Sequence, residues 1–456
     1  MKTKAIKIFV VLVVLSAILQ SCSNDDLKSD DEIQLISQTT ELITQWNSQW
    51  LAIDRYTENM RPNTIARALA YIHLAGYETA VVDMNGYTSN SNRLQDFNID
   101  FNRREDNVDL NLALNATYAK VAEHFMFSVT QNAIAEISTL YEENKIELST
   151  GLSQSEIDNS INWGTYVAET VIAYSQTDSE AETQIIDPNP ASYVPPVGDG
   201  LWIAGEGESA WFPYWESVRT FVIGSNETSS IAPDAEYSTE TSSRYYTKMD
   251  EVNVICTTAR LEDNEDLWIA EFWSDDVEGL MMSPPGRQFS IANQLILQEE
   301  LDYEQTLELL LKLGFAINDA AVSAWADKYT YNTQRPSTYI IEYINEDFTT
   351  NLARFISSPN PAFPSYPSGH ATFAGAAAGV FIDHFGGDTI NFTDRTHETR
   401  SEFRGLSRSY SAFSEMAEEN AYSRVPLGVH VQVDSDEGLR LGYEIAEAVS
   451  SYNLFN

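Results

Sequence analysis

Residues 364–381 read Pro-Ser-Tyr-Pro-Ser-Gly-His-Ala-Thr-Phe-Ala-Gly-Ala-Ala-Ala-Gly-Val-Phe, and this stretch decides the fold. Pro364 and Pro367 stiffen the chain ahead of Ser368, and the Ala-rich run that follows predicts a helix over 368–385. Small residues occupy nearly every face of this helix, so it can pack closely at the centre of a helical bundle. Its N-terminus would present free backbone N–H groups, a serine hydroxyl and a glycine, which together suit an oxyanion.

The preceding motif, residues 328–336, reads Lys-Tyr-Thr-Tyr-Asn-Thr-Gln-Arg-Pro. Lys328 and Arg335 are seven residues apart, or two helical turns, so both start on one face of a predicted helix. Pro336 disfavours the helical conformation for Arg335, which predicts that the helix ends there and that Arg335 can turn toward the same point as Lys328. The motif therefore predicts two converging cations.

The following motif, residues 423–434, reads Ser-Arg-Val-Pro-Leu-Gly-Val-His-Val-Gln-Val-Asp. Arg424 adds a third cation, with a planar fork suited to oxyanions. His430 and Asp434 are four residues apart, one helical turn, so the carboxylate can orient the imidazole and leave one ring nitrogen free for bonding. Each motif alone is ordinary, but three in this order indicate an anion site within 328–434.

The overall composition limits the partners of such a site. The chain has 456 residues, with 27 Lys+Arg against 68 Asp+Glu and a formal net charge of −41. This charge repels phosphate backbones and anionic lipids, so we expect no binding to nucleic acid and no membrane contact through a basic surface. Hydrophobic residues make up 43%, which indicates a folded chain.

The N-terminus has the pattern of an export signal. We expect residues 1–21 to be a lipoprotein signal peptide, because three lysines precede an apolar run over 8–19 that is too short to span a bilayer. Cys22 would then be acylated, and 22–32 would form an acidic tether. An ordinary secretory signal cleaved nearby is the alternative. The pattern predicts an exported protein, lipid-anchored in the outer membrane or periplasm of a Gram-negative bacterium, whose only membrane contact is the anchor.

The rest of the chain reads as one all-α domain over 33–456. Apolar residues recur at three- and four-residue steps, and alternating strand patterns are scarce. The second predicted helix would be capped by Asn63 or Thr64, and His73 within it is expected to be a hydrogen-bonded core residue. A loop rich in Pro and Trp, 185–215, should pack against the body. The predicted helices cover 32–56, 63–84, 109–127, 154–176, 262–274, 288–299, 303–330, 368–385, 409–424 and 436–452.

The three motifs together resemble the signature shared by the vanadium-dependent haloperoxidases and the acid phosphatases of the phosphatidic acid phosphatase type 2 superfamily. That signature is Lys-x6-Arg-Pro, then Pro-Ser-Gly-His, then Ser-Arg-x5-His-x3-Asp, and all parts are complete over 328–434. More loosely, residues 66–73 and the 185–215 loop resemble bacterial haloperoxidases, in particular iodoperoxidases. The resemblance implies an all-α helical bundle of the haloperoxidase/acid phosphatase type.

The resemblance also implies a vanadate cofactor, with hydrogen peroxide and halide as substrates and small organic molecules as further acceptors. His430 would be the single ligand to the metal, oriented by Asp434, and His370 would be the acid–base residue. Nearby cations lower the pKa of an unliganded imidazole, which favours a neutral His370 able to take a proton from hydrogen peroxide. The vanadate oxygens would be bound by Lys328, Arg335, Ser368, Gly369 and Arg424.

Two other functions remain open at this stage. In a phosphatase His430 would attack phosphorus and His370 would protonate the leaving oxygen. The length of the chain, the lack of lipid-phosphatase spans, and two aromatic residues beside the site, Trp325 and Phe363, favour the peroxidase. A non-catalytic nutrient-binding lipoprotein would need the three cations to lie apart. Phe363 stands where algal bromoperoxidases carry a second histidine, so we expect a modest oxidant that takes iodide first and bromide less well.

Overall fold

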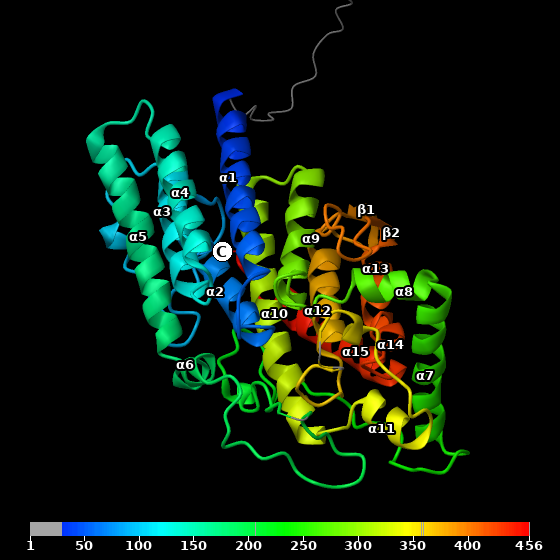
Figure 1. Cartoon of the computed structure of the whole chain (residues 1–456). Helices are drawn as coiled ribbons and strands as arrows, with labels where there is room; N and C mark the ends of the chain where they lie inside the picture. The colour runs from blue at the N-terminus through cyan, green and yellow to red at the C-terminus, as the bar shows by residue number, and fades with distance from the viewer. Residues whose placement is uncertain (1–29, 206, 357, 359, 456) are drawn as a thin grey trace, which may run out of the picture.

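Helix α10 (Tyr303–Tyr331) runs through the middle of a helical bundle in the computed structural model, which describes residues 30–205, 207–356, 358 and 360–455 (Figure 1). Asp302 caps its start, since its side chain accepts the N–H of Gln305 while the Gln305 side chain accepts the N–H of Asp302. By length and composition alone, α10 is the one helix in the described part of the chain that could cross a membrane, and its apolar window is wholly buried inside the protein.

In the described part of the chain, α10 is accompanied by thirteen further α-helices, by the four-residue helix α14 and by a small hairpin of two strands. In the first part of the chain the helices are α1 (Asp30–Asp54), α2 (Asn63–Ala80), α3 (Leu110–Phe125), α4 (Gln131–Leu148), α5 (Gln154–Gln176) and α6 (Ser179–Ile186). The later ones are α7 (Arg244–Glu262), α8 (Glu265–Phe272), α9 (Pro284–Gln298), α11 (Pro336–Tyr343), α12 (Gly369–His384), α13 (Phe413–Tyr422), α14 (Arg424–Leu427) and α15 (Gln432–Ser450). The antiparallel strands are β1 (Thr389–Asp394) and β2 (Arg408–Ala412), with Phe392 opposite Tyr410.

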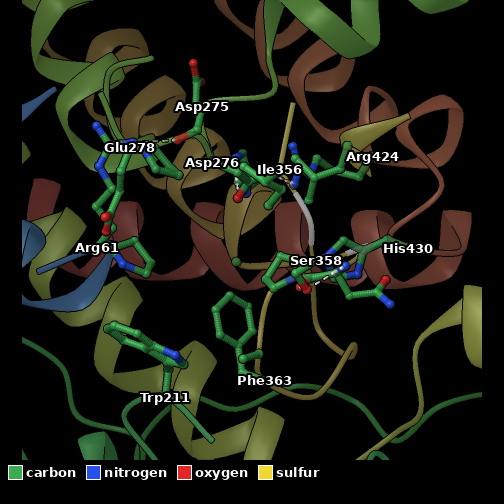
Figure 2. Close-up of a pocket in the computed structure, with 18 of the residues that line it drawn as sticks. Arg61, Trp211, Asp275, Asp276, Glu278, Ile356, Ser358, Phe363, Arg424 and His430 are labelled. Atoms are coloured by element: carbon green, nitrogen blue, oxygen red, sulfur yellow. Dashed lines mark hydrogen bonds and ion pairs between the residues drawn. The ribbon is translucent and has the colours of Figure 1, made fainter. Parts of the chain in front are cut away.

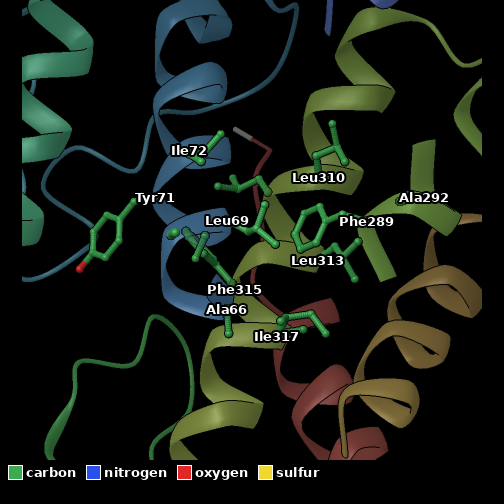
Figure 3. Close-up of a cluster of buried hydrophobic side chains, with 14 of the residues drawn as sticks. Ala66, Leu69, Tyr71, Ile72, Phe289, Ala292, Leu310, Leu313, Phe315 and Ile317 are labelled. Carbon is green, nitrogen blue, oxygen red and sulfur yellow. The ribbon is translucent and has the colours of Figure 1, made fainter. Parts of the chain in front are cut away.

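The largest hydrophobic core joins α10 to α2 and α9. Figure 3 shows Leu310 and Leu313 of α10 beside Leu69 of α2 and Phe289 of α9, all of them buried. Every residue of α2 is buried, so this helix has no solvent-facing stripe. A core of this kind fixes α10 along its length, and the end of α10 that carries Lys328 is therefore held in place.

Helices α12 and α15 approach one another through glycines on both sides. A Cβ added at Gly375 would lie 2.6 Å from the carbonyl oxygen of Leu439, and one at Gly442 would lie 2.3 Å from that of Thr372. Such distances mean that backbone meets backbone, as the small residues of the α12 sequence predicted. This contact places Ser368 at the start of α12 against the start of α15, where the Ser368 N–H donates to the carbonyl oxygen of Asp434 at 2.8 Å.

The predicted all-α bundle is confirmed, and several details of the prediction are wrong. Residues 408–412 form a strand where the prediction had a helix from 409, because β1 offers them a ladder of backbone partners. Helices α4, α6, α7, α11 and α14 were not predicted. Asn63 is the first residue of α2 and Pro62 occupies the cap position without a side-chain hydrogen bond, so neither Asn63 nor Thr64 is the cap.

His73 is buried as predicted, but the expected hydrogen bond is absent. Neither ring nitrogen has a partner among the described residues, and the ring stacks on Phe289 with centroids 4.8 Å apart. Burial lowers the pKa of His73 to about 3, so the ring is neutral. The predicted signal peptide (1–21) and most of the tether (22–32) lie outside the described residues, and the single domain over 33–456 stays a prediction.

Candidate active site

Three buried cations converge beside the N-terminus of α12, as the motifs predicted. Arg335 and Arg424 are 1% and 0% exposed, and Lys328 is 0% exposed. Burial, together with the neighbouring Arg335, lowers the pKa of Lys328 well below its usual value, and burial lowers the pKa of Arg335 to about 9. So much positive charge in one buried place is expensive unless negative groups share it.

Arg335 reaches the site by a different path from the predicted one. Helix α10 ends at Tyr331, because Asn332 adopts the left-handed conformation with φ 47°, and the next residues run extended beside Gly200 and Leu201. Arg335 itself is extended and precedes Pro336, the first residue of α11. The proline therefore acts as predicted on Arg335, but the two cations do not share a helix.

Arg335 fixes the chemical state of His430. Its Nη1 lies 3.0 Å from Nε2 of His430, and because a guanidinium can only donate, Nε2 must carry the lone pair. The proton then sits on Nδ1, which donates to Oδ2 of Asp434 at 2.9 Å. Burial and the nearby cations lower the pKa of His430 well below its usual value. The ring is thus neutral, and its unprotonated nitrogen faces Arg335.

Asp434 sits in the first turn of α15 rather than one helical turn after His430, which precedes the helix. The Ser365 hydroxyl donates to the same Oδ2 at 2.6 Å. Burial raises the pKa of Asp434 to about 6, against the lowering effect of Ser365 and Lys328. Two donors on one oxygen hold the carboxylate in place, so it can orient the imidazole as predicted.

His370 has the opposite tautomer from His430. Its Nε2 lies 3.1 Å from the carbonyl oxygen of Ser274, which can only accept, so the proton is on Nε2 and Nδ1 carries the lone pair. Burial first, and then the Arg424 charge, lower the pKa of His370 to about 4. At neutral pH the ring is therefore an unprotonated base, the state that the motif analysis predicted.

A segment that the sequence did not single out completes the site. Nη2 of Arg424 binds Oδ2 of Asp276 at 2.6 Å, and its Nη1 donates to the carbonyl oxygen of Ser274 at 3.1 Å. Burial acts to raise the pKa of Asp276, but Arg424, His370 and Arg335 together outweigh it and the pKa is lowered. Asp275 and Arg287 behind it form a buried pair at 3.1 Å. The only signal in the sequence was an Asp-Asp pair after an apolar helix, which does not stand out among 68 acids.

Lys328 donates all three of its N–H bonds to backbone carbonyls. Its Nζ lies 3.0 Å from the oxygen of Pro364 and 2.8 Å from that of Ser365, and it also contacts that of Pro367. The lysine therefore holds the approach to Ser368 as well as supplying charge. The positive charge of Lys328 could attract a bound anion without any rearrangement. A direct hydrogen bond from Lys328 to the anion would require one of the three carbonyl oxygens to be replaced.

The two predicted aromatic neighbours are both present. Trp325 and Phe363 lie with ring centroids 4.9 Å apart, and Lys328 Nζ is 5.7 Å and 5.2 Å from the two rings respectively. A Cβ added at Gly369 would lie 3.1 Å from Trp325, so this ring closes one side of the site and a larger residue at 369 would press against it. The two rings place apolar surface beside Lys328, and a less polar surrounding strengthens the electrostatic interactions of its charge.

A cavity of about 370 Å³ opens onto this cluster (Figure 2). In that view His430 and Arg424 lie on one side, and Arg61, Glu278 and Trp211 lie on the other. Among the described residues, Nη2 of Arg335 and Nε of Arg424 are buried without a hydrogen-bond partner. Unpartnered guanidinium donors, together with the unprotonated Nε2 of His430 that Arg335 Nη1 contacts, fit a tetrahedral oxyanion with one nitrogen ligand.

Comparison with known proteins agrees with the fold. Residues 308–454 match the family model of the VCPO second helical-bundle domain. The crystal structure of a bacterial vanadium-dependent iodoperoxidase superimposes with a TM-score of 0.74 at 23% identity, covering 94% of this chain and 97% of that chain. A holo-type bacterial vanadium-dependent chloroperoxidase gives 0.64 at 15% identity over 86% and 92% of the two chains.

Two curated proteins match more locally. The vanadium chloroperoxidase of Curvularia inaequalis is 22% identical over 214 residues, 36% of this chain and 35% of that protein. The vanadium-dependent bromoperoxidase of Ascophyllum nodosum is 34% identical over 110 residues, 22% of this chain and 20% of that protein. The chain thus spans about a third or less of the length of these curated relatives.

The structure defines a helical bundle with a buried cluster of cations whose chemistry suits a tetrahedral oxyanion. Residues 308–454 match the VCPO second helical-bundle domain, and the chain as a whole shares its fold with the solved vanadium-dependent iodoperoxidase and chloroperoxidase.

Proposed function

We propose that this protein is a vanadium-dependent haloperoxidase, which oxidises halide with hydrogen peroxide to hypohalous acid and prefers iodide. The observation that carries the proposal is that buried donors of Arg335 and Arg424 lack partners in the same cluster where the unprotonated Nε2 of His430 accepts from Nη1 of Arg335. The similarity in fold to a bacterial iodoperoxidase supports it, and so do the matches to a chloroperoxidase and a bromoperoxidase.

Each residue has a role that follows from its geometry. Lys328, Arg335 and Arg424 would neutralise vanadate, and His430 would bind it through Nε2. The Ser368 hydroxyl and the Gly369 N–H, at the start of α12, would donate to its oxygens. Vanadate, when bound, supplies a Lewis acid that polarises hydrogen peroxide.

His370 would handle the proton. Its Nδ1 carries the lone pair, since Nε2–H is donated to the Ser274 carbonyl oxygen, and the ring is neutral because burial and Arg424 lower its pKa to about 4. It can therefore accept a proton from hydrogen peroxide and return it to the oxygen that leaves as water. Asp276, whose Oδ1 is 4.0 Å from Nε2, would stabilise the imidazolium while it exists.

One comparison tests the proposal. Purified protein is assayed for peroxide-dependent oxidation of iodide and bromide, with and without orthovanadate, beside hydrolysis of a phosphate ester. Vanadate-dependent iodide oxidation is the expected result. Ester hydrolysis that vanadate inhibits, with no halide oxidation, would assign the site to a phosphatase instead.

We also propose that the protein is exported and anchored through a lipid on Cys22. The lysine-rich start and the short apolar run before Cys22 support this. Growth with a radiolabelled fatty acid should label the wild type, and Cys22→Ser should remove the label. Label retained by that variant would contradict the anchor.

A further inference from the structure

The cavity above the cations is larger than its proposed substrates need. Halide and hydrogen peroxide are each no more than two heavy atoms, whereas about 370 Å³ is in the range of pockets that hold organic ligands. The outer part of the cavity, which we call the outer pocket, is lined by Arg61, Glu208, Trp211 and Glu278, among others. These residues come from segments outside the three motifs.

The walls of the cavity are aromatic and held in place. Trp325 and Phe373 have ring centroids 6.4 Å apart and continue the surface formed with Phe363. Trp211 is half-buried, and its backbone is fixed at both ends: its N–H donates to the carbonyl oxygen of Ala362 at 3.0 Å, and its carbonyl accepts the Tyr329 hydroxyl at 2.6 Å. A rigid set of rings suits a planar aromatic guest.

Most charges in the cavity are neutralised by partners. Asp276 is paired with Arg424 at 2.6 Å, and Asp275 with Arg287 at 3.1 Å. Arg61 donates to the carbonyl oxygens of Asp275 and Met281 and lies 4.0 Å from a carboxylate oxygen of Asp54. The cations in the depth of the site would be matched by the bound oxyanion.

Two carboxylates remain. Within the described part of the chain, neither Glu208 nor Glu278 has a basic group within 4.0 Å. Glu278 is exposed and Glu208 partly so, and both line the cavity. Arg61 offsets part of the charge of Glu278, but the two carboxylates still add local negative charge to a chain whose net charge is −41, so the outer pocket attracts cations and repels anions.

We propose that the outer pocket binds the organic acceptor of the halogen, and that this acceptor is an electron-rich aromatic compound, such as a phenol, carrying no charge or a positive charge. The inference rests on the proposed function. Hydrogen peroxide, iodide and one proton give hypoiodous acid and water. The iodine of hypoiodous acid then forms a bond to a ring carbon, the ring loses the proton from that carbon, and the hydroxide released takes this proton to become water. No further oxidant is needed.

A competition in one tube tests the inference. Tyramine and 3-(4-hydroxyphenyl)propionate carry the same phenol on side chains of opposite charge, and both would be present in equal amounts with limiting peroxide and iodide. The same mixture treated with hypoiodous acid made chemically gives the ratio of products expected in free solution. Because the two phenols share one supply of oxidant, changes in the rate of iodide oxidation cancel from the ratio.

The enzyme should favour tyramine over the chemical reference. If each carboxylate lies about 8 Å from the charge on the guest, guests that differ by two charges should show a bias of about fourfold at physiological ionic strength and about tenfold at low salt. Glu278→Gln should reduce the bias to about twofold at physiological salt. Glu147→Gln on α4, an exposed helix that does not line the cavity, is the matched control and should leave the bias unchanged.

A second variant tests the aromatic wall. Trp211→Leu should raise the KM for tyramine several-fold. The rate of iodide oxidation without an organic acceptor, measured as the formation of triiodide, should stay that of the wild type.

The outcomes separate the two proposals. Normal triiodide formation with the chemical product ratio would overturn the acceptor site and leave the haloperoxidase standing. A bias that neither salt nor Glu278→Gln reduces would overturn the role of the carboxylates. Absence of triiodide formation would overturn both proposals.

Discussion

Gly438→Ala should damage the site without replacing a residue that binds the anion. The new Cβ would lie 2.5 Å from the carbonyl oxygen of Ser368 and 2.8 Å from Cβ of Ala371, whereas ordinary contact begins near 3.4 Å. The start of α12 must therefore move by about 0.9 Å, the difference between 3.4 Å and 2.5 Å. Neither helix can give way easily, because the obstacle is backbone.

The size of the effect follows from two opposing terms. Overpacking of this kind costs up to about 3 kcal/mol, and alanine gains about 1 kcal/mol over glycine in a helix, so unfolding free energy should fall by about 2 kcal/mol. Misplacing Ser368 and Gly369 by nearly 1 Å should lower kcat/KM for iodide about 100-fold.

Guanidinium unfolding and steady-state kinetics measure these two quantities. Gly387→Ala is the control. Gly387 lies three residues after the end of α12, has no atom within 4 Å of its added Cβ and does not have a positive φ. If Gly438→Ala matched that control in both stability and kcat/KM, the close contact between α12 and α15 would not be what positions the site.

The remaining predictions concern single groups. His430→Ala should lose bound vanadium and activity with helical content intact by circular dichroism; stoichiometric vanadium in the variant would reject His430 as the ligand. His370→Ala should keep vanadium, because the cations and His430 remain, and should lose peroxide-dependent turnover; equal loss of vanadium in both variants would show that their roles are reversed. The His73→Phe variant should resist acid better than the wild type. The pKa of His73 is about 3 in the folded protein and 6.5 in the unfolded chain, so His73 lowers the free energy of unfolding as the pH falls below 6.5. Between pH 7 and pH 4, urea titrations should show that the variant avoids a loss of about 3 kcal/mol. Iodide should be oxidised faster than bromide, and bromide faster than chloride, in kinetics at fixed peroxide; chloride turnover equal to that of iodide would contradict this order.

The sequence predicted the site better than the route by which the chain builds it. Lys328, Arg335 and Arg424 converge as expected, because three motifs each placed a cation beside a turn. The expected helix from Lys328 to Arg335 was wrong, since the left-handed conformation of Asn332 ends α10 and backbone pairing with Gly200 guides the next residues. That pairing joins segments more than a hundred residues apart, which local periodicity cannot reveal.

Asp276 was missed for a related reason. Its role depends on Arg424, which lies 148 residues further along the chain, and an acidic residue in an acidic sequence carries no local signal. The strand at 408–412 was missed because its pairing with β1 overrides a sequence that also suits a helix. By contrast, α5 (Gln154–Gln176) matched its predicted range, because the Ser153–Glu156 capping box marks its start in the sequence itself.

The bond between Arg424 and the 274–276 segment sets a limit on how this protein can be divided. The region that matches the family model, 308–454, contains all three motifs but not Ser274 or Asp276. Excised on its own, it would carry Arg424 without the carboxylate and carbonyl that orient it, and His370 without the acceptor of its Nε2 proton. The smallest transplantable unit for grafting this site onto another scaffold must therefore begin upstream of α9, and a library of shortened chains should lose anion binding as soon as that segment is removed.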